Sequence, residues 1–430
     1  MLAAFTAWSP ADTVTAPPWV VAARLGVVVA VCATAFYYND LYDFEVPHDF
    51  AQLFTRLARA LGLSALALAV TYVLYPPAII GGNFVSMALP GLLVALLAVR
   101  GTVYVLARRP AFSERVVLLG GGALAAELAA HIHARPDLAA RLVGVLAPSG
   151  AEGPGPRLGA YGDLQDVVRR YRPDRIIVAL PDRRGHLPVA DLLACRVRGI
   201  HIEEGTRAYE RFMRRLAVET LAPSALVFGD GFRVTRIRLA VKRLLSVAVA
   251  LAGLWVAAPL MAAIALAIKL ESRGPVFFVQ ERVGLHGRPF RLVKFRTMRE
   301  AVPAADGVWE RDNASRVTRL GAVLRKYRLD ELPQFINILR GDMSLVGPRP
   351  EMAGNIATFS AVIPFYNLRH EVRPGLTGWA QVKAGYSMST EEVTRKLCYD
   401  LYYIKHLSLA FDLQILLDTV KFVLSGKRPG

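Results

Sequence analysis

Apolar runs long enough to cross a lipid bilayer are the feature that most limits what this sequence can fold into. The first run covers residues 19–38, and a second covers 61–75, with a helical segment ahead of it that can extend it. A third, 84–106, follows a turn containing Pro-Pro and Gly-Gly. Because about 20 apolar residues suffice to cross the bilayer core, the sequence predicts three transmembrane helices in residues 19–109, or four if the third run folds as a hairpin.

Arginines near the ends of these runs predict their orientation. Arg56 and Arg59 precede the second run, and Arg108 and Arg109 follow the third, so alternating spans place both pairs on one side. By the positive-inside rule that side is the cytoplasm. Residues 1–18 contain no Lys or Arg and are expected to form an N-terminal tail on the opposite side.

The overall composition fits a membrane protein with a basic cytoplasmic part. Of the 430 residues, 54% are hydrophobic, and the formal net charge is +17. Such a charge suits nucleic acid, anionic phospholipid or a phosphorylated substrate. The basic residues form no recognisable zinc finger, basic zipper or RNA-binding motif, so no nucleic acid partner is expected. The three cysteines stand far apart, which argues against a disulfide framework or a zinc site.

Residues 110–235 change to alternating strands and helices, a pattern typical of an α/β Rossmann-like domain. Strands are predicted at 116–119, 142–146 and 175–180, and the turn at 120–125 fits GxGxxA, a phosphate-binding pattern. The second strand, however, ends in Leu-Ala-Pro, where a ribose-binding acid would be expected. A packing or regulatory module and a working dinucleotide site both stay open, and the first is favoured.

A further apolar run, 244–268, has two features that oppose a simple span. Pro259 lies in its middle, where a helix loses a backbone hydrogen bond at a cost of about 3 kcal/mol. Basic residues flank both ends of the run: Lys242, Arg243, Lys269 and Arg273. A helix that enters the bilayer, breaks at Pro259 and returns to the same face accounts for both features. The sequence therefore predicts a re-entrant membrane helix over 236–273 and a mixed α/β cytoplasmic domain over 274–430.

Residues 325–351 of that last domain combine adjacent carboxylates with several cations. Asp330 and Glu331 lie beside Arg325 and Arg328, and a rigid Pro-Arg-Pro turn closes the stretch. Phosphoryl transfer needs cations that spread phosphate charge, and a carboxylate can serve as metal ligand, base or nucleophile. The alternative is that Asp330 caps a helix that begins near residue 332, with the arginines on a solvated face. Spacing alone does not decide between them.

The last part of the chain resembles a known family, the bacterial polyprenyl-phosphate sugar-1-phosphate transferases of the large, multidomain type. The resemblance runs over residues 242–422 and includes GDMSLVGPRPE at 341–351 and RPGLTGW at 373–379. Other matching blocks, in order, lie at 242–243, 274–275, 280–284, 294–298, 329–334 and 399–404. The upstream order of several spans and then a nucleotide-binding-like domain is similar to the exopolysaccharide-priming members of this monotopic phosphoglycosyl transferase family.

The resemblance implies a reaction and roles for particular residues. Family members move a sugar-1-phosphate from a nucleotide diphosphate sugar, here expected to be a UDP-sugar, to undecaprenyl phosphate and release nucleoside monophosphate. This is the first membrane step of exopolysaccharide, capsule or O-antigen synthesis. It implies that Asp330 is the nucleophile that forms a phospho-sugar intermediate, that Glu331 is its partner, and that both hold Mg²⁺. The candidate phosphate-binding cations are Lys294, Arg296, Arg325, Arg328, Arg349 and Arg373.

The resemblance also implies a location, the bacterial inner membrane, with the catalytic domain on the cytoplasmic face against the lipid bilayer. A homodimer stays open. The sequence departs from the family at Leu244–Ser246, where an acidic residue is common, and at Ala258, where a serine often precedes the proline. The competing interpretation is a non-catalytic membrane scaffold that senses nucleotide sugars through the turn at 120–125.

Overall fold

The computed structural model describes a large part of the chain, which its internal contacts divide into a first unit, residues 1–203, and a second unit, residues 204–430. The described residues are 17–39, 41, 50–76, 94–95, 98–99, 102, 113–135, 140–148, 155–180, 187–221, 223–232, 235–299, 316–384 and 389–425.

Two apolar helices begin the first unit, α3 (Pro18–Tyr38) and α4 (Phe50–Leu74). Both contain a stretch long and apolar enough to cross a membrane, of 21 residues in α3 and 19 residues in α4. They pack on each other through a small buried cluster made of Phe36, Leu41, Leu57, Ala60 and Leu61. The first two predicted spans are therefore helices of the expected length. The third predicted span, 84–106, falls largely outside the described residues.

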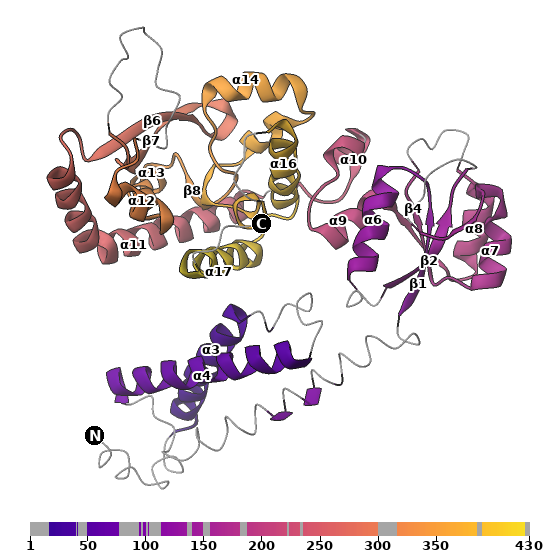
Figure 1. Ribbon diagram of the computed structural model, residues 1–430, viewed down its shortest axis with the longest axis horizontal. Helices are drawn as coiled ribbons and strands as arrows, with labels where there is room; N and C mark the ends of the chain where they lie inside the picture. The colour runs from indigo at the N-terminus through magenta and orange to yellow at the C-terminus, as the bar shows by residue number, and fades with distance from the viewer. Residues whose placement is uncertain are drawn as a thin grey trace. The chain divides into compact units, whose positions relative to one another are not determined.

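A five-stranded sheet of order β3-β2-β1-β4-β5 follows in the first unit, with β1 parallel to both β2 and β4. Figure 1 shows α6 on one face of this sheet and α7 and α8 on the other. The strands are β1 (Glu114–Leu119), β2 (Ala140–Leu146), β3 (Arg157–Gly159), β4 (Arg175–Val178) and β5 (His201–Glu204). The helices are α6 (Ala123–Ala134), η4 (Tyr161–Asp163), α7 (Leu164–Tyr171) and α8 (Val189–Val197). The predicted alternation of strands and helices is thus present.

The glycine-rich turn after β1 has a packing role that needs no ligand. Gly120 has a φ of +144°, and a Cβ at this position would lie 2.2 Å from the carbonyl oxygen of Ala179. Its backbone N–H donates to the carbonyl of Leu146 over 2.9 Å. Only glycine can therefore bring the end of β1 this close to its two neighbouring strands. Ligand binding by this turn stays a prediction.

The second unit contains two small sheets among helices, an antiparallel pair β6–β7 and a parallel pair β8–β9. Its main core gathers Ile338, Val346, Tyr366, Trp379 and Tyr403 among others. The elements before the first sheet are α9 (Gly205–Met213), η5 (Val218–Thr220), α10 (Pro223–Phe228) and α11 (Arg236–Glu271). The elements from β6 onward are β6 (Phe277–Val283), η6 (Leu285–Gly287), β7 (Pro289–Phe295), α12 (Arg319–Lys326), η7 (Leu329–Glu331), α13 (Gln334–Arg340), β8 (Ser344–Val346), α14 (Ala353–Val362), η8 (Tyr366–Glu371), β9 (Gly375–Thr377), α15 (Trp379–Lys383), α16 (Thr390–Lys405) and α17 (Leu409–Ser425).

Residues 204–232 belong to the second unit rather than to the α/β domain in which the sequence placed them. Glu210 of α9 accepts from Lys405 Nζ at 2.7 Å and pairs with His406 Nε2 at 2.6 Å. The indole N–H of Trp379 donates to the carbonyl of Arg214 over 2.9 Å. Trp379 is 1% exposed and belongs to the main core of this unit. These contacts connect α9 and the segment after it to α15 and α16 within the second unit.

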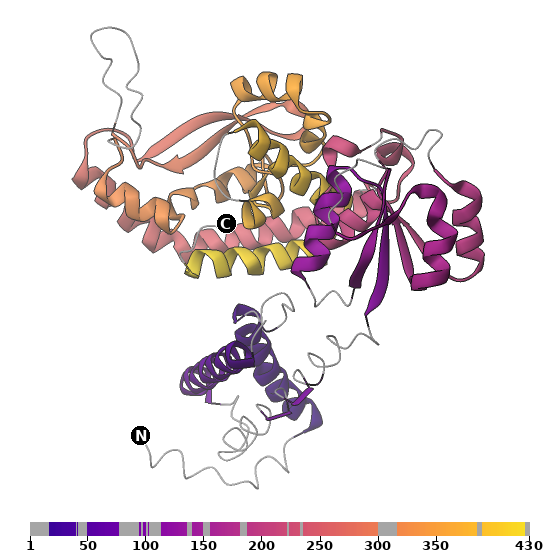
Figure 2. The same cartoon turned by 45° about the vertical axis from the view of Figure 1, so that its right-hand side comes forward.

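The long apolar helix α11 is continuous over 36 residues with Pro259 inside it. The predicted interruption is therefore not an unwound segment. Around the proline the side chains point away from the protein, with Trp255 82% and Val256 69% exposed. Both halves of the helix are nevertheless attached to the second unit: Ala250 lies in its main core, and Ile264 and Ile268 pack with Phe295 and Leu324. Figures 1 and 2 show α17 alongside the first half of α11.

Candidate active site

The acidic pair lies on a short turn between two helices. Helix α12 begins after Thr318, whose hydroxyl accepts from Gly321 N over 2.9 Å, and it ends at Lys326. Arg328 then takes a left-handed conformation, with φ of 54°, and reverses the chain into η7, which carries Asp330 and Glu331. Helix α13 begins later, after Pro333, without a side-chain cap. The interpretation of Asp330 as a helix cap is therefore wrong.

Glu331 is the electrostatic centre of the site. It is 7% exposed, and three cations from separate segments converge on its carboxylate. Oε1 accepts from Arg349 Nη2 at 3.0 Å and from Lys294 Nζ at 3.3 Å, while Oε2 lies 3.5 Å from Arg328 Nη1. A buried carboxylate is stable only with such partners.

The two neighbouring carboxyl groups have opposite pKa shifts. Burial raises the pKa of Glu331, but Arg349, Lys294 and Arg328 outweigh burial and lower it to about 2. Burial and the adjacent Glu331 raise the pKa of Asp330, and the nearby cations only partly oppose this. Among the described residues, Asp330 is coupled to its neighbours by charge rather than by hydrogen bonds. Its carboxylate is therefore the one that is free to react or to bind a ligand.

Strand β7 presents Lys294 to the acidic pair, and Asn337 fixes the distance between them. The side-chain oxygen of Asn337 accepts from Val293 N at 3.1 Å, and its Nδ2 donates to Arg291 O at 2.6 Å. Asn337 is fully buried on α13, directly after the acidic turn. Sequence reasoning missed this residue, although a polar amide between the apolar neighbours of α13 was a signal that could have found it.

Arg325 lies on the side of the site that faces Asp330. Its Nε donates to the hydroxyl of Thr297 at 2.9 Å, and its charge lowers the pKa of Asp330 against the effect of burial. The predicted cations that the structure gathers around the acidic pair are therefore Lys294, Arg325, Arg328 and Arg349.

The remaining two predicted cations hold other parts of the fold. Arg296 donates to the carbonyls of Ser272 and Arg273 at 2.9 and 2.8 Å, so it caps the C-terminal end of α11. Arg373 Nε donates to Gly341 O at 3.0 Å, at the C-terminal end of α13. Cations and donors at a helix C-terminus satisfy its free carbonyls. Both guanidinium groups donate to backbone carbonyls. These hydrogen bonds do not support the phosphate contacts predicted for Arg296 and Arg373, which stay predictions.

The acidic pair could bind a magnesium ion only if substrate phosphates and water supplied the remaining ligands. Within the described ranges, no group of three or more His, Cys, Asp or Glu side chains could hold a metal. Magnesium, however, is usually bound through one or two carboxylates and completed by substrate phosphates and water. Asp330 and Glu331 could supply those two carboxylates.

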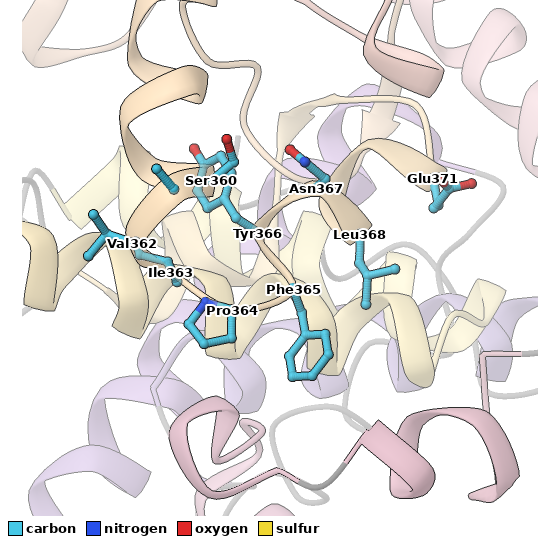
Figure 3. Close-up of a pocket in the computed structure, with 10 residues that line it drawn as sticks. Ser360, Val362, Ile363, Pro364, Phe365, Tyr366, Asn367, Leu368 and Glu371 are labelled. Carbon is cyan, nitrogen blue, oxygen red and sulfur yellow. The ribbon is translucent and has the colours of Figure 1, made fainter.

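A groove of about 450 Å³ lies apart from the residues of the acidic site, along the end of α14 and η8. Figure 3 shows the ring of Tyr366 and the side chains of Ser360 and Asn367 on the same side of it, with Phe365 on the other. None of its lining residues belongs to the stretch 325–351. The groove is therefore not the site of the predicted chemistry.

Comparison with known proteins assigns the part of the chain that contains the acidic pair to a protein family. The bacterial sugar transferase family matches residues 237–426, which include the acidic pair and its cations. The undecaprenyl-phosphate glucose phosphotransferase of Komagataeibacter xylinus is 33% identical over 321 residues, 72% of this chain and 59% of the relative. The UDP-N-acetylgalactosamine-undecaprenyl-phosphate N-acetylgalactosaminephosphotransferase of Aeromonas hydrophila is 47% identical over 186 residues, 43% of this chain and 44% of the relative.

These two relatives are longer proteins, of which the chain spans about half. A shorter relative is covered more fully. The UDP-glucose:undecaprenyl-phosphate glucose-1-phosphate transferase of Caulobacter vibrioides is 46% identical over 186 residues, 43% of this chain and 70% of the relative. With the sequence blocks, the buried acidic pair and these matches in agreement, the chain belongs to the bacterial sugar transferase family.

Proposed function

We propose that this protein transfers a sugar-1-phosphate from a UDP-sugar to undecaprenyl phosphate and releases uridine monophosphate. The observation that carries the proposal is the asymmetry of the acidic pair. Glu331 binds three cations, whereas Asp330, next to it, has no hydrogen-bonding partner among the described residues. Such a pair offers one anchored carboxylate and one that is available for covalent chemistry.

In the first step an oxygen of Asp330 attacks the sugar-bearing phosphorus of the donor. The bond from that phosphorus to the bridging oxygen breaks, and the electron pair leaves with the nucleoside monophosphate. Lys294, Arg325 and Arg349 would spread the charge of the phosphate oxygens as it develops. In the second step a phosphate oxygen of the lipid acceptor attacks the phospho-sugar on Asp330 and frees its carboxylate.

Glu331 would act in this reaction by holding groups in place. With a pKa of about 2 it binds a proton poorly at neutral pH, which makes it a weak general base. Its contacts instead fix Lys294 and Arg349 beside Asp330. A magnesium ion bound by the two carboxylates and the donor phosphates would neutralise charge and polarise the phosphoryl group.

We further propose that α11 is re-entrant and keeps the site at the cytoplasmic membrane surface. A straight helix of this length is about 54 Å long, well beyond the bilayer core of about 30 Å. Yet both ends are fixed to one folded unit, by Arg243 to the carbonyls of Ile338 and Leu339 and by Arg296 to Ser272. This attachment supports entry and exit at one face. A lipid acceptor and a soluble donor could then meet there, in a bacterial inner membrane.

Turnover of a donor panel tests the reaction. Full-length protein in detergent with undecaprenyl phosphate and Mg²⁺ would be given UDP-glucose, UDP-N-acetylgalactosamine and other nucleotide sugars. We expect uridine monophosphate from at least one donor and none after chelation of Mg²⁺. Release of uridine diphosphate would overturn the proposal in favour of transfer of the sugar alone. Binding without turnover would favour the nucleotide-sugar-sensing scaffold.

Isotope exchange tests the covalent intermediate separately. Without lipid acceptor, the first step is reversible, so labelled uridine monophosphate should be incorporated into the UDP-sugar. The Asp330→Asn variant should show no exchange, because an amide cannot take the phosphoryl group. Normal turnover by the wild type without any exchange would indicate direct transfer and contradict the intermediate.

A further inference from the structure

A buried ion pair lies directly behind the Pro-Arg-Pro turn that carries Arg349. Arg369 on η8 is 8% exposed and Asp400 on α16 is 2% exposed. Arg369 Nη2 donates to Asp400 Oδ2 at 2.9 Å and Nη1 donates to the hydroxyl of Tyr366 at 2.7 Å. These two acceptors hold the guanidinium in one orientation.

The same guanidinium also reaches the turn itself. Arg369 Nη2 donates to the backbone carbonyl of Arg349 at 3.0 Å, and Arg282 Nη1 donates to the next carbonyl, that of Pro350, at 3.2 Å. Arg349 stands between two prolines, which restrict the backbone torsions of the turn. The held carbonyl and the restricted torsions fix the position from which the Arg349 side chain starts, and from there Nη2 reaches Glu331 Oε1 at 3.0 Å.

Stability alone is a weak reason for burying such a pair. Removing two charges from water costs several kcal/mol per ion, and apolar side chains of similar volume often fill the same space at no loss. What the apolar replacement cannot provide is a donor to the carbonyl of Arg349. The Arg369–Asp400 ion pair can therefore hold the backbone of the Arg349 turn in position, which an apolar pair that merely fills the space could not do.

We propose that Arg369, oriented by Asp400 and Tyr366, is a positioning residue that holds the Arg349 turn so that Arg349 reaches Glu331. The proposal rests on the proposed function, because it assigns a task within that active site. Arg369 itself touches neither carboxylate of the acidic pair. Its effect passes through the main chain of Arg349.

The main test replaces the ion pair with apolar residues of similar volume, Arg369→Met together with Asp400→Leu. No buried charge is left unpaired, so the melting temperature should fall much less than it does for Arg369→Met alone. We expect kcat for uridine monophosphate release to fall about 10- to 100-fold, because small displacements of a charge-stabilising group have effects of this size. The KM for the UDP-sugar should change by less than about threefold, since donor contacts other than Arg349 remain.

A double-mutant cycle shows whether the loss acts through Arg349. In an Arg349→Lys background, the apolar pair should lower kcat by less than about twofold further. A full independent loss in that background would overturn the proposal, as would a wild-type kcat in the apolar-pair variant. If that variant does not fold, Arg369→Lys replaces it, which keeps the charge and loses the planar fork. It should give an intermediate kcat, again without further effect in the Arg349→Lys background.

A matched control and a separate readout complete the design. Arg175 and Glu203 form a comparable ion pair in the first unit, at 2.8 Å, and Arg175→Met with Glu203→Leu should leave kcat unchanged. A wild type that releases no uridine monophosphate would overturn the proposed function and not this one. A structure of the apolar-pair variant would then decide: an Arg349–Glu331 contact still near 3.0 Å overturns the positioning role, and its loss supports it.

Discussion

Arg349 Nη2 lies 3.0 Å from Glu331 Oε1, and this contact joins the acidic turn to the Pro-Arg-Pro turn, 18 residues later in the chain. The contact makes the acidic pair unequal. Glu331 is held as an anion by its cations, while burial beside Glu331 disfavours the charge of Asp330. Two adjacent carboxylates with opposite pKa shifts are a common arrangement where one reacts and the other positions.

Neutral substitutions of the two acids should differ in their effect on stability. Asp330→Asn removes the proposed nucleophile, so uridine monophosphate release should fall at least about 10³-fold. Because the folded state disfavours the charge of Asp330, its melting temperature should be equal or higher. Glu331→Gln leaves Lys294, Arg328 and Arg349 without their shared anion and should melt lower. Thermal melts of both variants in one detergent check this. A destabilised Asp330→Asn protein would contradict the assigned asymmetry.

The pH dependence of the free energy of unfolding should reveal how much the ionised Glu331 carboxylate stabilises the fold. Its folded pKa of about 2 lies below its ordinary value, so the charged form contributes roughly 3 kcal/mol to folding. A lowered carboxyl pKa gives stability that is fully present above about pH 4.5 and is lost as pH falls towards 2. Free energies of unfolding of wild type and Glu331→Gln, measured from pH 6 to 3, should therefore converge with acid. Asp400 and His370, with pKa values of about 6 and 4, titrate in both proteins and cancel in the difference. Parallel curves would rule out this role of Glu331.

The sequence predicted the acidic pair and most of its cations because they lie in short, ordered motifs. Arg296 stands two residues after Lys294, but its hydrogen bonds go to the end of α11. Alternation along a strand would put both side chains on one face. Strand β7, however, ends at Phe295, so the period of two no longer applies, and Arg296 turns to Ser272 at the end of α11.

Long-range polar pairs were beyond sequence reasoning. Lys242 and Asp412 are 170 residues apart and still form a buried ion pair, and Arg369 and Asp400 do so across 31 residues. The local sequence pattern predicts which residues form a helix. It does not predict which charged side chains on two different helices will form an ion pair. A signal in the sequence is a charged residue within an apolar helix face, as at Asp400, whose neighbours three positions earlier and four positions later are Leu397 and Ile404.

Both ends of α11 should be accessible from the same side of the membrane. Ile237 and Leu270 are 77% and 79% exposed, and a cysteine at either should react with an impermeant thiol reagent in inside-out vesicles only. A cysteine in place of Trp255, near the proline, should react from neither side because lipid covers it. The native cysteines Cys32, Cys195 and Cys398 are buried, so they give a low background. Labelling of Ile237→Cys and Leu270→Cys from opposite sides would show a true span.

The ion pair between α11 and α17 should hold the membrane helix on the catalytic core. Lys242 Nζ lies 2.6 Å from Asp412 Oδ2, and the hydroxyl of Tyr403 donates to Asp412 Oδ1 at 2.7 Å. Lys242→Met leaves Asp412 buried without its cation and should cost about 3–5 kcal/mol. Adding Asp412→Leu should restore most of that loss. Unfolding free energies of the single and double variants check this, and a double variant less stable than Lys242→Met would contradict it.

A methyl group at Gly347 should disturb the active site through its backbone. A Cβ there would lie 2.4 Å from the carbonyl oxygen of Arg373 and 2.9 Å from the N of Gly375, both backbone atoms that cannot rotate away. Gly347→Ala must therefore displace the segment that leads directly into Pro348 and Arg349. We expect a lower melting temperature and a kcat reduced about tenfold or more, since Arg349 moves with its turn.

Gly354 provides the matched control for this substitution. It lies seven positions later, in the first turn of α14, and a Cβ there meets nothing within 4 Å. Gly354→Ala should leave kcat unchanged and raise stability by about 0.5–1 kcal/mol, because alanine loses less backbone entropy than glycine in a helix. Parallel assays of uridine monophosphate release and melting separate the two effects. If Gly347→Ala loses stability but keeps its kcat, the position of the Arg349 turn is not what sets the rate.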